Sequence, residues 1–197
     1  MAEMREERLI WVDAQDREIG TGEKLDTHRR KQLHRAFSIF IADPDTGALL
    51  LQMRAPGKYH SGGLWTNSCC SHPRQGQTMA QALHDRLLLE LGIDVPLHIE
   101  PGTGYAFGPD AALEAGSFRY FADFGELAEH ELDHVYVLYQ SAAALTLHPD
   151  PEEIAQCKWV TPAALDAWME ARPQDFTAWF GPAYALARKI LEKNQPQ

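Results

Sequence analysis

Apolar residues recur along most of the chain in short runs that predict β-strands. Residues 36–42 and 48–54 are largely apolar, and the Asp-Pro-Asp-Thr-Gly segment between them is typical of a turn, so together they predict a β-hairpin. Clear alternation of apolar and polar residues over 132–140 predicts a strand with one buried face. The other predicted strands cover residues 9–12, 64–70, 94–100, 117–124 and 158–160.

Helical spacing of apolar residues marks three further segments. Residues 78–91 predict a helix with Thr78 as its N-cap and Gly92 just beyond its last residue. A second helix is predicted from residue 162 to about residue 171, because its first residue is a proline, which is favoured at that position. A third helix is predicted over 182–193, where the basic residues at the end suit the helix dipole.

The length and composition indicate a single globular unit. A chain of 197 residues with 45% hydrophobic residues can bury a substantial core, and no repeat or linker divides it. We therefore expect one domain over residues 1–197, with residues 1–8 and 194–197 as flexible ends. The longest uncharged apolar run is too short to span a bilayer, so we expect a cytoplasmic protein without a membrane partner.

Charge and cysteine content narrow the classes of partner. The formal net charge is −10, from 28 acidic and 18 basic residues, which disfavours a nucleic-acid partner because such binding needs a basic surface. An anionic small molecule remains compatible, provided that a local group of Lys and Arg side chains receives it. The three cysteines, Cys69, Cys70 and Cys157, are an odd number and fit a reducing compartment rather than a disulfide framework.

Residues 64–76 hold the densest cluster of reactive side chains. Cys70 and His72 are two residues apart, so on an extended strand they point to the same side. A thiol and an imidazole on one side of a strand end could form a metal site, a nucleophile with its base, or a proton-transfer site. The plain alternative is a buried cysteine and a structural histidine.

Two other segments add candidate ligands. Residues 23–35 form the one strongly basic run, which predicts either a solvated surface or a neighbourhood for an anion or a metal. Glu129 and Glu131 are two residues apart, so an extended backbone presents both carboxylates on one side, where a cation between them would relieve their repulsion. If the fold brings the segments together, a divalent transition metal would suit the set His28, His34, His72, Glu129 and Glu131.

Four motifs carry a resemblance to a known family. They are Leu-His-Arg-Ala-Phe-Ser at 33–38, Trp-Thr-Asn-Ser-Cys-Cys-Ser-His-Pro at 65–73, Leu-Glu-Leu-Gly at 89–92 and Glu-His-Glu-Leu at 129–132. In order and approximate spacing they resemble the type 1 isopentenyl-diphosphate isomerases, a branch of the Nudix fold. The resemblance implies an α/β (α+β) fold: a mixed β-sheet flanked by helices, with an added N-terminal strand and C-terminal helices.

The resemblance also implies roles for individual residues. Cys70 and Glu131 would exchange protons with a small-molecule diphosphate, isopentenyl or dimethylallyl diphosphate, while Tyr120 hydrogen-bonds to Glu131. The metal ligands would be His28, His34, His72, Glu129 and Glu131, with Mn²⁺, Zn²⁺ or Mg²⁺ left open. Glu90 would help to bind a second Mg²⁺ on the diphosphate. The substrate would be held by Lys24, Arg54, Lys58 and Arg86, with Trp179 as an aromatic wall.

Two other functions stay open at this point. A Nudix-type diphosphate hydrolase needs a cluster of acidic residues on a helix, but in residues 83–92 Arg86 and Leu89 replace two of its glutamates and leave Glu90. A non-catalytic metal- or ligand-binding module would need neither a thiol nor its proton partner. By spacing alone, Arg86 and Glu90 predict an ion pair on a helix surface. The oligomeric state is not predicted.

Overall fold

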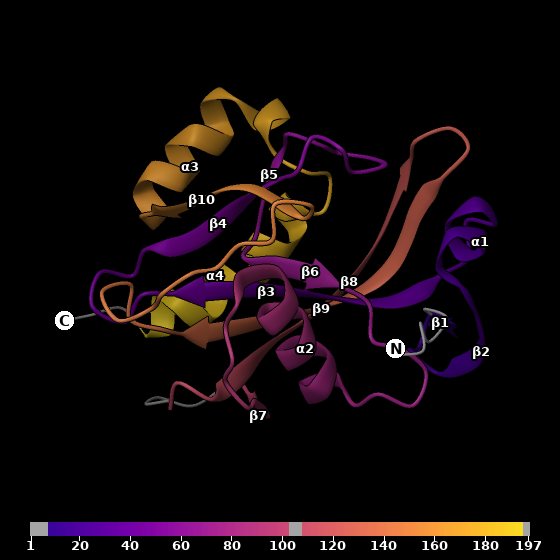
Figure 1. The fold of residues 1–197 in the computed structure, drawn as a ribbon, viewed down its shortest axis with the longest axis horizontal. Helices are drawn as coiled ribbons and strands as arrows, with labels where there is room; N and C mark the ends of the chain where they lie inside the picture. Colours follow the sequence, from indigo (N-terminus) through magenta and orange to yellow (C-terminus); the bar gives the residue numbers. More distant parts are fainter. Residues whose placement is uncertain (1–7, 103–107, 195–197) are drawn as a thin grey trace.

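The computed structural model describes residues 8–102 and 108–194, which form a mixed β-sheet with helices on its two faces (Figure 1). The strands are β1 (Arg8–Val12), β2 (Glu18–Glu23), β3 (His34–Ala42), β4 (Leu49–Arg54), β5 (Trp65–Thr66), β6 (Cys69–Ser71), β7 (His98–Pro101), β8 (Ala111–Asp123), β9 (Ala128–Tyr139) and β10 (Ile154–Val160). The α-helices are α1 (Lys24–Arg29), α2 (Met79–Leu91), α3 (Pro162–Ala171) and α4 (Phe180–Lys193), and a 3₁₀ turn covers Pro173–Asp175.

The main path of the sheet runs β10-β4-β3-β9-β8-β7. Strands β3 and β9 are parallel, as are β7 and β8, and the other pairs are antiparallel. The register of β3 against β9 places His34 opposite Glu131. This pairing explains how two segments almost one hundred residues apart deliver side chains to one end of the sheet.

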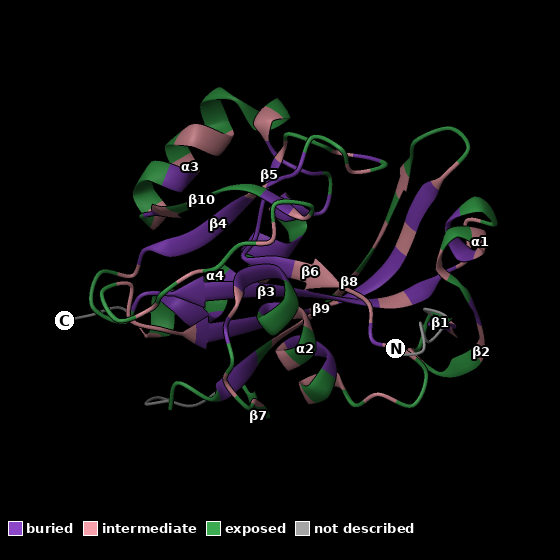
Figure 2. Ribbon diagram, viewed as in Figure 1, coloured by how far each residue is buried: buried purple, intermediate pink, exposed green. Residues whose placement is uncertain are grey.

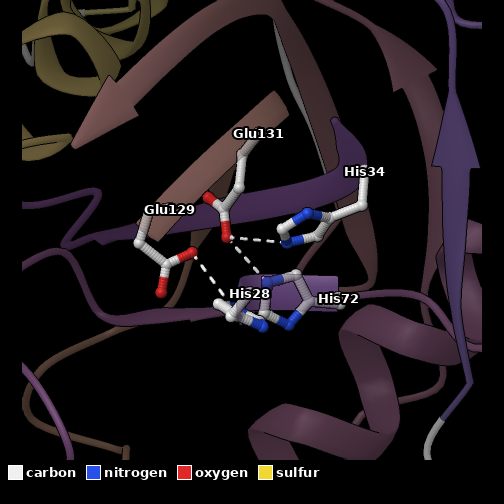
Figure 3. A group of neighbouring side chains, drawn as sticks. All are labelled: His28, His34, His72, Glu129 and Glu131. Carbon is white, nitrogen blue, oxygen red and sulfur yellow. Dashed lines mark hydrogen bonds and ion pairs between the residues drawn. The ribbon is translucent and has the colours of Figure 1, made fainter. Parts of the chain in front are cut away.

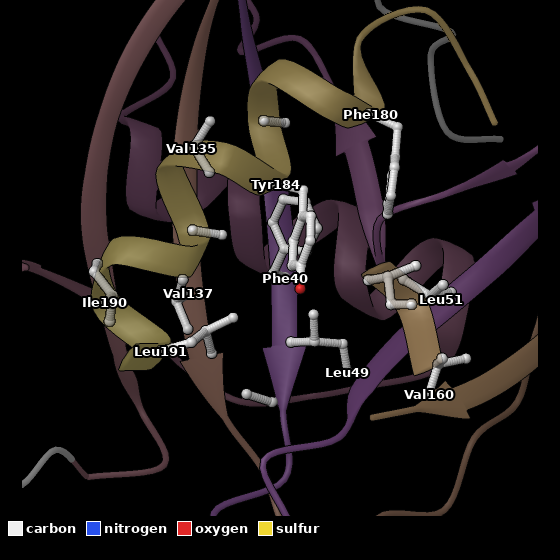
Figure 4. Close-up of a cluster of buried hydrophobic side chains, with 14 of the residues drawn as sticks. Phe40, Leu49, Leu51, Val135, Val137, Val160, Phe180, Tyr184, Ile190 and Leu191 are labelled. Atoms are coloured by element: carbon white, nitrogen blue, oxygen red, sulfur yellow. The ribbon is translucent and has the colours of Figure 1, made fainter. Parts of the chain in front are cut away.

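Each face of the sheet has its own apolar core. On one face, α4 contributes Phe180, Tyr184 and Ile190 against residues of β3, β4, β8 and β9 (Figure 4). On the other face, α2 contributes Leu83, Leu87 and Leu91. Because apolar side chains cover both faces, the central strands β3 and β4 are buried almost throughout (Figure 2). A side cluster that includes Ile10 and Leu132 fixes the N-terminal hairpin of β1 and β2.

The sheet splits where β3 and β4 diverge. These strands pair only at Ile41–Leu50 and Ala42–Leu49, and farther on β6 pairs with β3 while β5 pairs with β4. The predicted continuous strand over 64–70 is therefore wrong, because the chain crosses from β4 to β3 at Asn67 and Ser68. The Ser68 hydroxyl accepts from the Ile41 N–H at 2.7 Å and donates to the Leu50 carbonyl at 2.6 Å, which joins the two diverging strands.

Most other predicted elements are present with shifted ends. The hairpin of 36–42 and 48–54 is confirmed, and the helix over 162–171 has the predicted bounds. Thr78 caps α2 through a capping box and Gly92 follows the helix with a φ of 70°, as predicted. Strand β2 and helix α1 were not predicted as regular structure.

Two further predictions bear on the ends of the chain and on membranes. Residues 1–7 and 195–197 of the predicted flexible ends lie outside the described residues. Within the described residues, no helix has both the length and the apolar character needed to cross a membrane.

Candidate active and metal site

Hydrogen bonds to backbone carbonyls fix the rings of two histidines and leave one nitrogen of each ring available. His28, near the end of α1, uses Nδ1 to reach the Lys24 carbonyl at 2.6 Å, and His34, at the start of β3, uses Nδ1 to reach the Gln32 carbonyl at 2.8 Å. A carbonyl can only accept, so both Nδ1 atoms carry the proton, and in the neutral rings both Nε2 atoms keep their lone pair. This tautomer is the one that ligates a metal through Nε2.

Five side chains converge at this place, and Figure 3 shows their ring nitrogens and carboxylates turned toward one another. The potential ligand atoms of His28, His34, His72, Glu129 and Glu131 all lie within 4.8 Å of one another. His72 Nε2 is 2.7 Å from Glu131 Oε1, and His28 Nε2 is 3.2 Å from Glu129 Oε2. Glu129 and Glu131 point to the same side of β9, as their spacing predicted.

The buried polar atoms of this cluster fit a divalent cation. His28 Nε2, His34 Nε2 and Glu129 Oε2 are buried and have no hydrogen-bond partner within the described residues. Such unpaired atoms are costly in a protein interior unless an ion or a water receives them. Three imidazoles and two carboxylates form a mixed nitrogen and oxygen set that suits a transition-metal ion. The set fits the metal site that the sequence suggested.

The charges of the cluster also favour a bound cation. Burial and the neighbouring Glu129 carboxylate oppose the ionisation of Glu131, but the imidazoles of His34 and His72 hold the pKa of its carboxyl below the ordinary value. Burial lowers the pKa of His72 to about 4, which keeps the ring neutral near pH 7. Burial also opposes protonation of His28, but Glu129 raises its pKa above the usual value. Ionised carboxylates beside imidazoles form an electron-rich pocket in which a cation takes the place of protons.

A cavity of about 50 Å³ lies next to this cluster. Cys70, Tyr120, Glu131 and Trp179 all line it, although they come from β6, β8, β9 and the turn before α4. The Tyr120 hydroxyl donates to Glu131 Oε2 at 2.6 Å, and the rings of Tyr120 and Trp179 have centroids 6.1 Å apart. Cys70 and His72 line the same cavity, so the prediction that they face one way is confirmed.

Burial sets the protonation states of the cavity. Burial raises the pKa of the Cys70 thiol well above its usual value, partly offset by the Arg54 cation. Burial, with Glu131 close by, also raises the pKa of the Tyr120 hydroxyl. The cavity therefore combines a protonated thiol, a protonated phenol and an ionised carboxylate.

The four cationic side chains predicted to bind the substrate meet at the same cavity. They are Lys24, Arg54, Lys58 and Arg86. The Arg54 guanidinium carbon lies 5.4 Å from the centre of the Trp179 ring, and its Nε is buried without a hydrogen-bond partner in the described chain. Lys58 forms an ion pair with Glu153. The four side chains form the local group of Lys and Arg residues that an anionic ligand would require.

The prediction of a surface ion pair between Arg86 and Glu90 is wrong. Both residues line the cavity, and the Glu90 side chain is only 3% exposed. Arg86 Nε donates to Glu90 Oε1 at 3.0 Å, and Gln52 approaches the other carboxylate oxygen at 3.4 Å. The pair faces inward because this part of α2 forms a wall of the cavity. Helix spacing alone does not show which side of a helix borders a cavity.

Several cavity residues were missed by sequence reasoning. They are Gln52, Tyr59, His60, Asp133 and Glu153. Asp133 had a detectable signal, since it continues the spacing of Glu129 and Glu131 along one face of β9; its carboxylate accepts from Ser38 Oγ at 2.8 Å. His60 and Glu153 lie in irregular segments or at a strand edge, where no periodicity marks a buried side chain.

Comparison with known proteins places this geometry in a family. Residues 32–180 match the NUDIX domain model. The chain is 42% identical over 178 residues to an isopentenyl-diphosphate Delta-isomerase of Photobacterium profundum, a match that covers 89% of this chain and 91% of that protein. It is 41% identical over 187 residues to a protein of the same name from Streptomyces coelicolor, with 94% and 85% of the two chains covered.

Solved structures agree on the fold. DR0079 from Deinococcus radiodurans has a TM-score of 0.67 at 22% identity and covers 92% of this chain and 98% of its own. The MutT protein from Methanosarcina mazei has a TM-score of 0.55 at 13% identity, with 82% and 92% covered. At these identities the likeness concerns the fold alone. The family model and the relatives above 40% identity together show that this chain belongs to the isopentenyl-diphosphate Delta-isomerase family of NUDIX-domain proteins.

Proposed function

We propose that this protein interconverts isopentenyl diphosphate and dimethylallyl diphosphate, with Cys70 and Glu131 as the two proton-transfer groups. The observation that carries this proposal is that a thiol and a carboxylate from different strands line one cavity together with Tyr120 and Trp179. Metal binding alone would require neither Cys70 nor the hydrogen bond from Tyr120 to Glu131.

The reaction requires one acid and one base. Moving the double bond adds a proton at one carbon and removes a proton from another, so the two groups must start in opposite protonation states. The pKa of Cys70 is raised by burial while that of Glu131 is lowered by its histidine neighbours, which provides one protonated and one ionised group. Which of the two acts first depends on the direction of the reaction.

The aromatic side chains suit a cationic intermediate. Protonation of an alkene leaves positive charge on carbon, and an indole face stabilises such charge by about 0.5–2 kcal/mol. Trp179 is only 3% exposed, so little water reaches its ring. Tyr120, by donating to Glu131 Oε2, orients the carboxylate and leaves Oε1 toward His72.

The cationic side chains would bind the diphosphate. Arginine can donate two parallel hydrogen bonds to phosphate oxygens, and the unpaired Arg54 Nε is a donor at the cavity wall. Lys24, Lys58 and Arg86 would supply further positive charge around it. Hard cations prefer oxygen ligands, so the buried carboxylate of Glu90 would share a Mg²⁺ ion with the diphosphate.

A second cation would be held by His28, His34, His72, Glu129 and Glu131. Mn²⁺, Zn²⁺ and Mg²⁺ are the candidates, and the nitrogen donors favour the first two. When bound, such an ion would neutralise the paired carboxylates and fix the position of Glu131. The single-domain organisation and the cytoplasmic location stay predictions from the sequence.

The test is incubation of the purified protein with isopentenyl diphosphate and Mg²⁺ in D₂O. Isomerisation yields dimethylallyl diphosphate that carries deuterium, without release of phosphate. Release of phosphate or pyrophosphate would instead indicate a hydrolase, and no change in the substrate would indicate a binding module.

Variants of the adjacent thiols test the assignment of roles. We expect Cys70→Ala and Glu131→Gln each to abolish deuterium incorporation. Cys69→Ala is the matched control: Cys69 is fully buried, its thiol lies beside Glu90 and it does not line the cavity, so most activity should remain. Full activity in Cys70→Ala would refute the role proposed for that thiol.

A further inference from the structure

His60 is a buried histidine with no part in the ligand set or in the proton transfer. It belongs to the loop between β4 and β5, yet the residue is only 8% exposed while its neighbour Tyr59 is 47% exposed. The loop is bent so that the imidazole points inward. Ser61 has a left-handed backbone with a φ of 54°, and a Cβ on Gly62 would lie 2.6 Å from the Pro56 carbonyl oxygen. Ser61 is a non-glycine residue in a strained conformation, and such conformations gather at functional positions.

Both ring nitrogens of His60 have partners. Nε2 forms a hydrogen bond with Glu129 Oε1, and Nδ1 lies 3.1 Å from Ser61 Oγ. An ionised carboxylate only accepts, so Nε2 carries the proton and donates it, and in the neutral ring Nδ1 then accepts from the Ser61 hydroxyl. The result is a directed chain of hydrogen bonds from Ser61 through His60 to Glu129.

The ring is also clamped by aromatic neighbours. It stacks on Phe124, from the turn between β8 and β9, with centroids 4.6 Å apart and planes 7° apart, and it meets Trp179 edge to face at 6.0 Å. The His60 backbone carbonyl accepts from Arg54 at 3.4 Å. These contacts leave the imidazole little freedom to rotate, so its Nε2–H has a fixed direction.

The two carboxylate oxygens of Glu129 therefore make different contacts. Oε1 is held by His60, while Oε2 has no hydrogen-bond partner among the described residues and faces His28 Nε2 at 3.2 Å inside the ligand cluster. His60 is not one of the five residues whose ligand atoms converge there, so it acts on the cluster through Glu129.

We propose that His60 is the positioning residue of the metal site, which orients Glu129 so that its Oε2 serves as a ligand. Partners behind a metal ligand commonly contribute about 10- to 100-fold to metal affinity. This inference rests on the proposed metal site but does not depend on the isomerase reaction, because its readout is metal binding.

Two variants separate the hydrogen bond from the packing. His60→Phe keeps an aromatic ring beside Phe124 but has no donor for Glu129. His60→Gln loses the ring but keeps an N–H that can reach Glu129. His98→Ala is the control, because His98 is half-exposed on β7 and does not line the cavity. The full-length proteins are freed of metal with a chelator, and Zn²⁺ and Mn²⁺ dissociation constants are measured by competition with a chromogenic chelator.

We expect His60→Phe to weaken binding about 10- to 100-fold, His60→Gln to recover most of that loss, and His98→Ala to match the unmodified protein. The absorption spectrum of bound Co²⁺ should change in His60→Phe and stay close to the original in His60→Gln. Unchanged affinity in His60→Phe, or an equal loss in both His60 variants, would overturn the role of His60. Failure of the unmodified protein to bind either ion would instead refute the metal site, and the inference with it.

Discussion

The Ser68 hydroxyl joins the two strands that separate in front of the cavity, which makes it a sensitive point of the fold. It is completely buried, accepts from the Ile41 N–H and donates to the Leu50 carbonyl. Ile41 and Leu50 belong to the last pair of residues at which β3 and β4 still face each other, so in Ser68→Ala both backbone groups lose the hydroxyl that bridges them where the strands separate. The position is buried, so no bulk water replaces the hydroxyl.

The expected cost follows from these two bonds. Each hydrogen bond of the buried hydroxyl contributes about 0.5–1.5 kcal/mol, so the loss of both costs about 1–3 kcal/mol. For a chain of this size each kcal/mol lowers the melting temperature by roughly 2–4 °C. Ser68→Ala should therefore melt at least about 2 °C below the unmodified protein. Cys69 and Cys70 follow directly on β6, so isomerase activity should fall as well.

Urea denaturation followed by circular dichroism measures the free energy of unfolding for both proteins. Ser117→Ala is the matched control, because Ser117 is exposed on β8 and removal of its hydroxyl should change stability by less than about 0.5 kcal/mol. If Ser68→Ala unfolds with the same free energy as Ser117→Ala, the hydroxyl does not join the strands and the reasoning fails.

Three further predictions concern the site. Tyr120→Phe removes the 2.6 Å bond to Glu131 and should lower kcat roughly 10- to 100-fold; a change in KM alone would contradict this. In the metal-free folded protein, burial lowers the pKa of His72 from 6.5 to about 4, so the unfolded chain takes up this proton at a higher pH than the folded chain does. The free energy of unfolding should therefore drop by about 3 kcal/mol as the pH falls from 6.5 to about 4. Urea denaturation would show a shallower pH dependence in His72→Asn, and an equal slope would exclude this cause. Removing divalent ions with a chelator should abolish isomerisation until an ion is added back; activity that survives chelation would rule out a required metal.

Local elements could be predicted where one short-range rule decided the backbone. The hairpin of 36–42 and 48–54 and the caps of α2 at Thr78 and Gly92 depend on turn and capping residues that are adjacent in sequence. The predicted strand over 64–70 failed because a polar residue, Ser68, leaves the alternating pattern to bond two other strands. Helix α1 was missed because its stability comes from tertiary contacts, such as the bond from Trp11 Nε1 to Thr27 Oγ1 at 2.9 Å.

For the site, the sequence by itself determined which candidate ligands exist and that Glu129 and Glu131 point to one side of a strand. The two-residue spacing of Glu129 and Glu131 holds wherever β9 lies, because side chains alternate along any strand. Only the tertiary structure decided what meets them, since the parallel register of β3 with β9 brings His34 opposite Glu131, and an irregular loop turns His60 onto Glu129. Such contacts depend on the pairing of segments that are distant in sequence. No periodic pattern in the sequence specifies this pairing, and it is fixed only when the whole sheet packs.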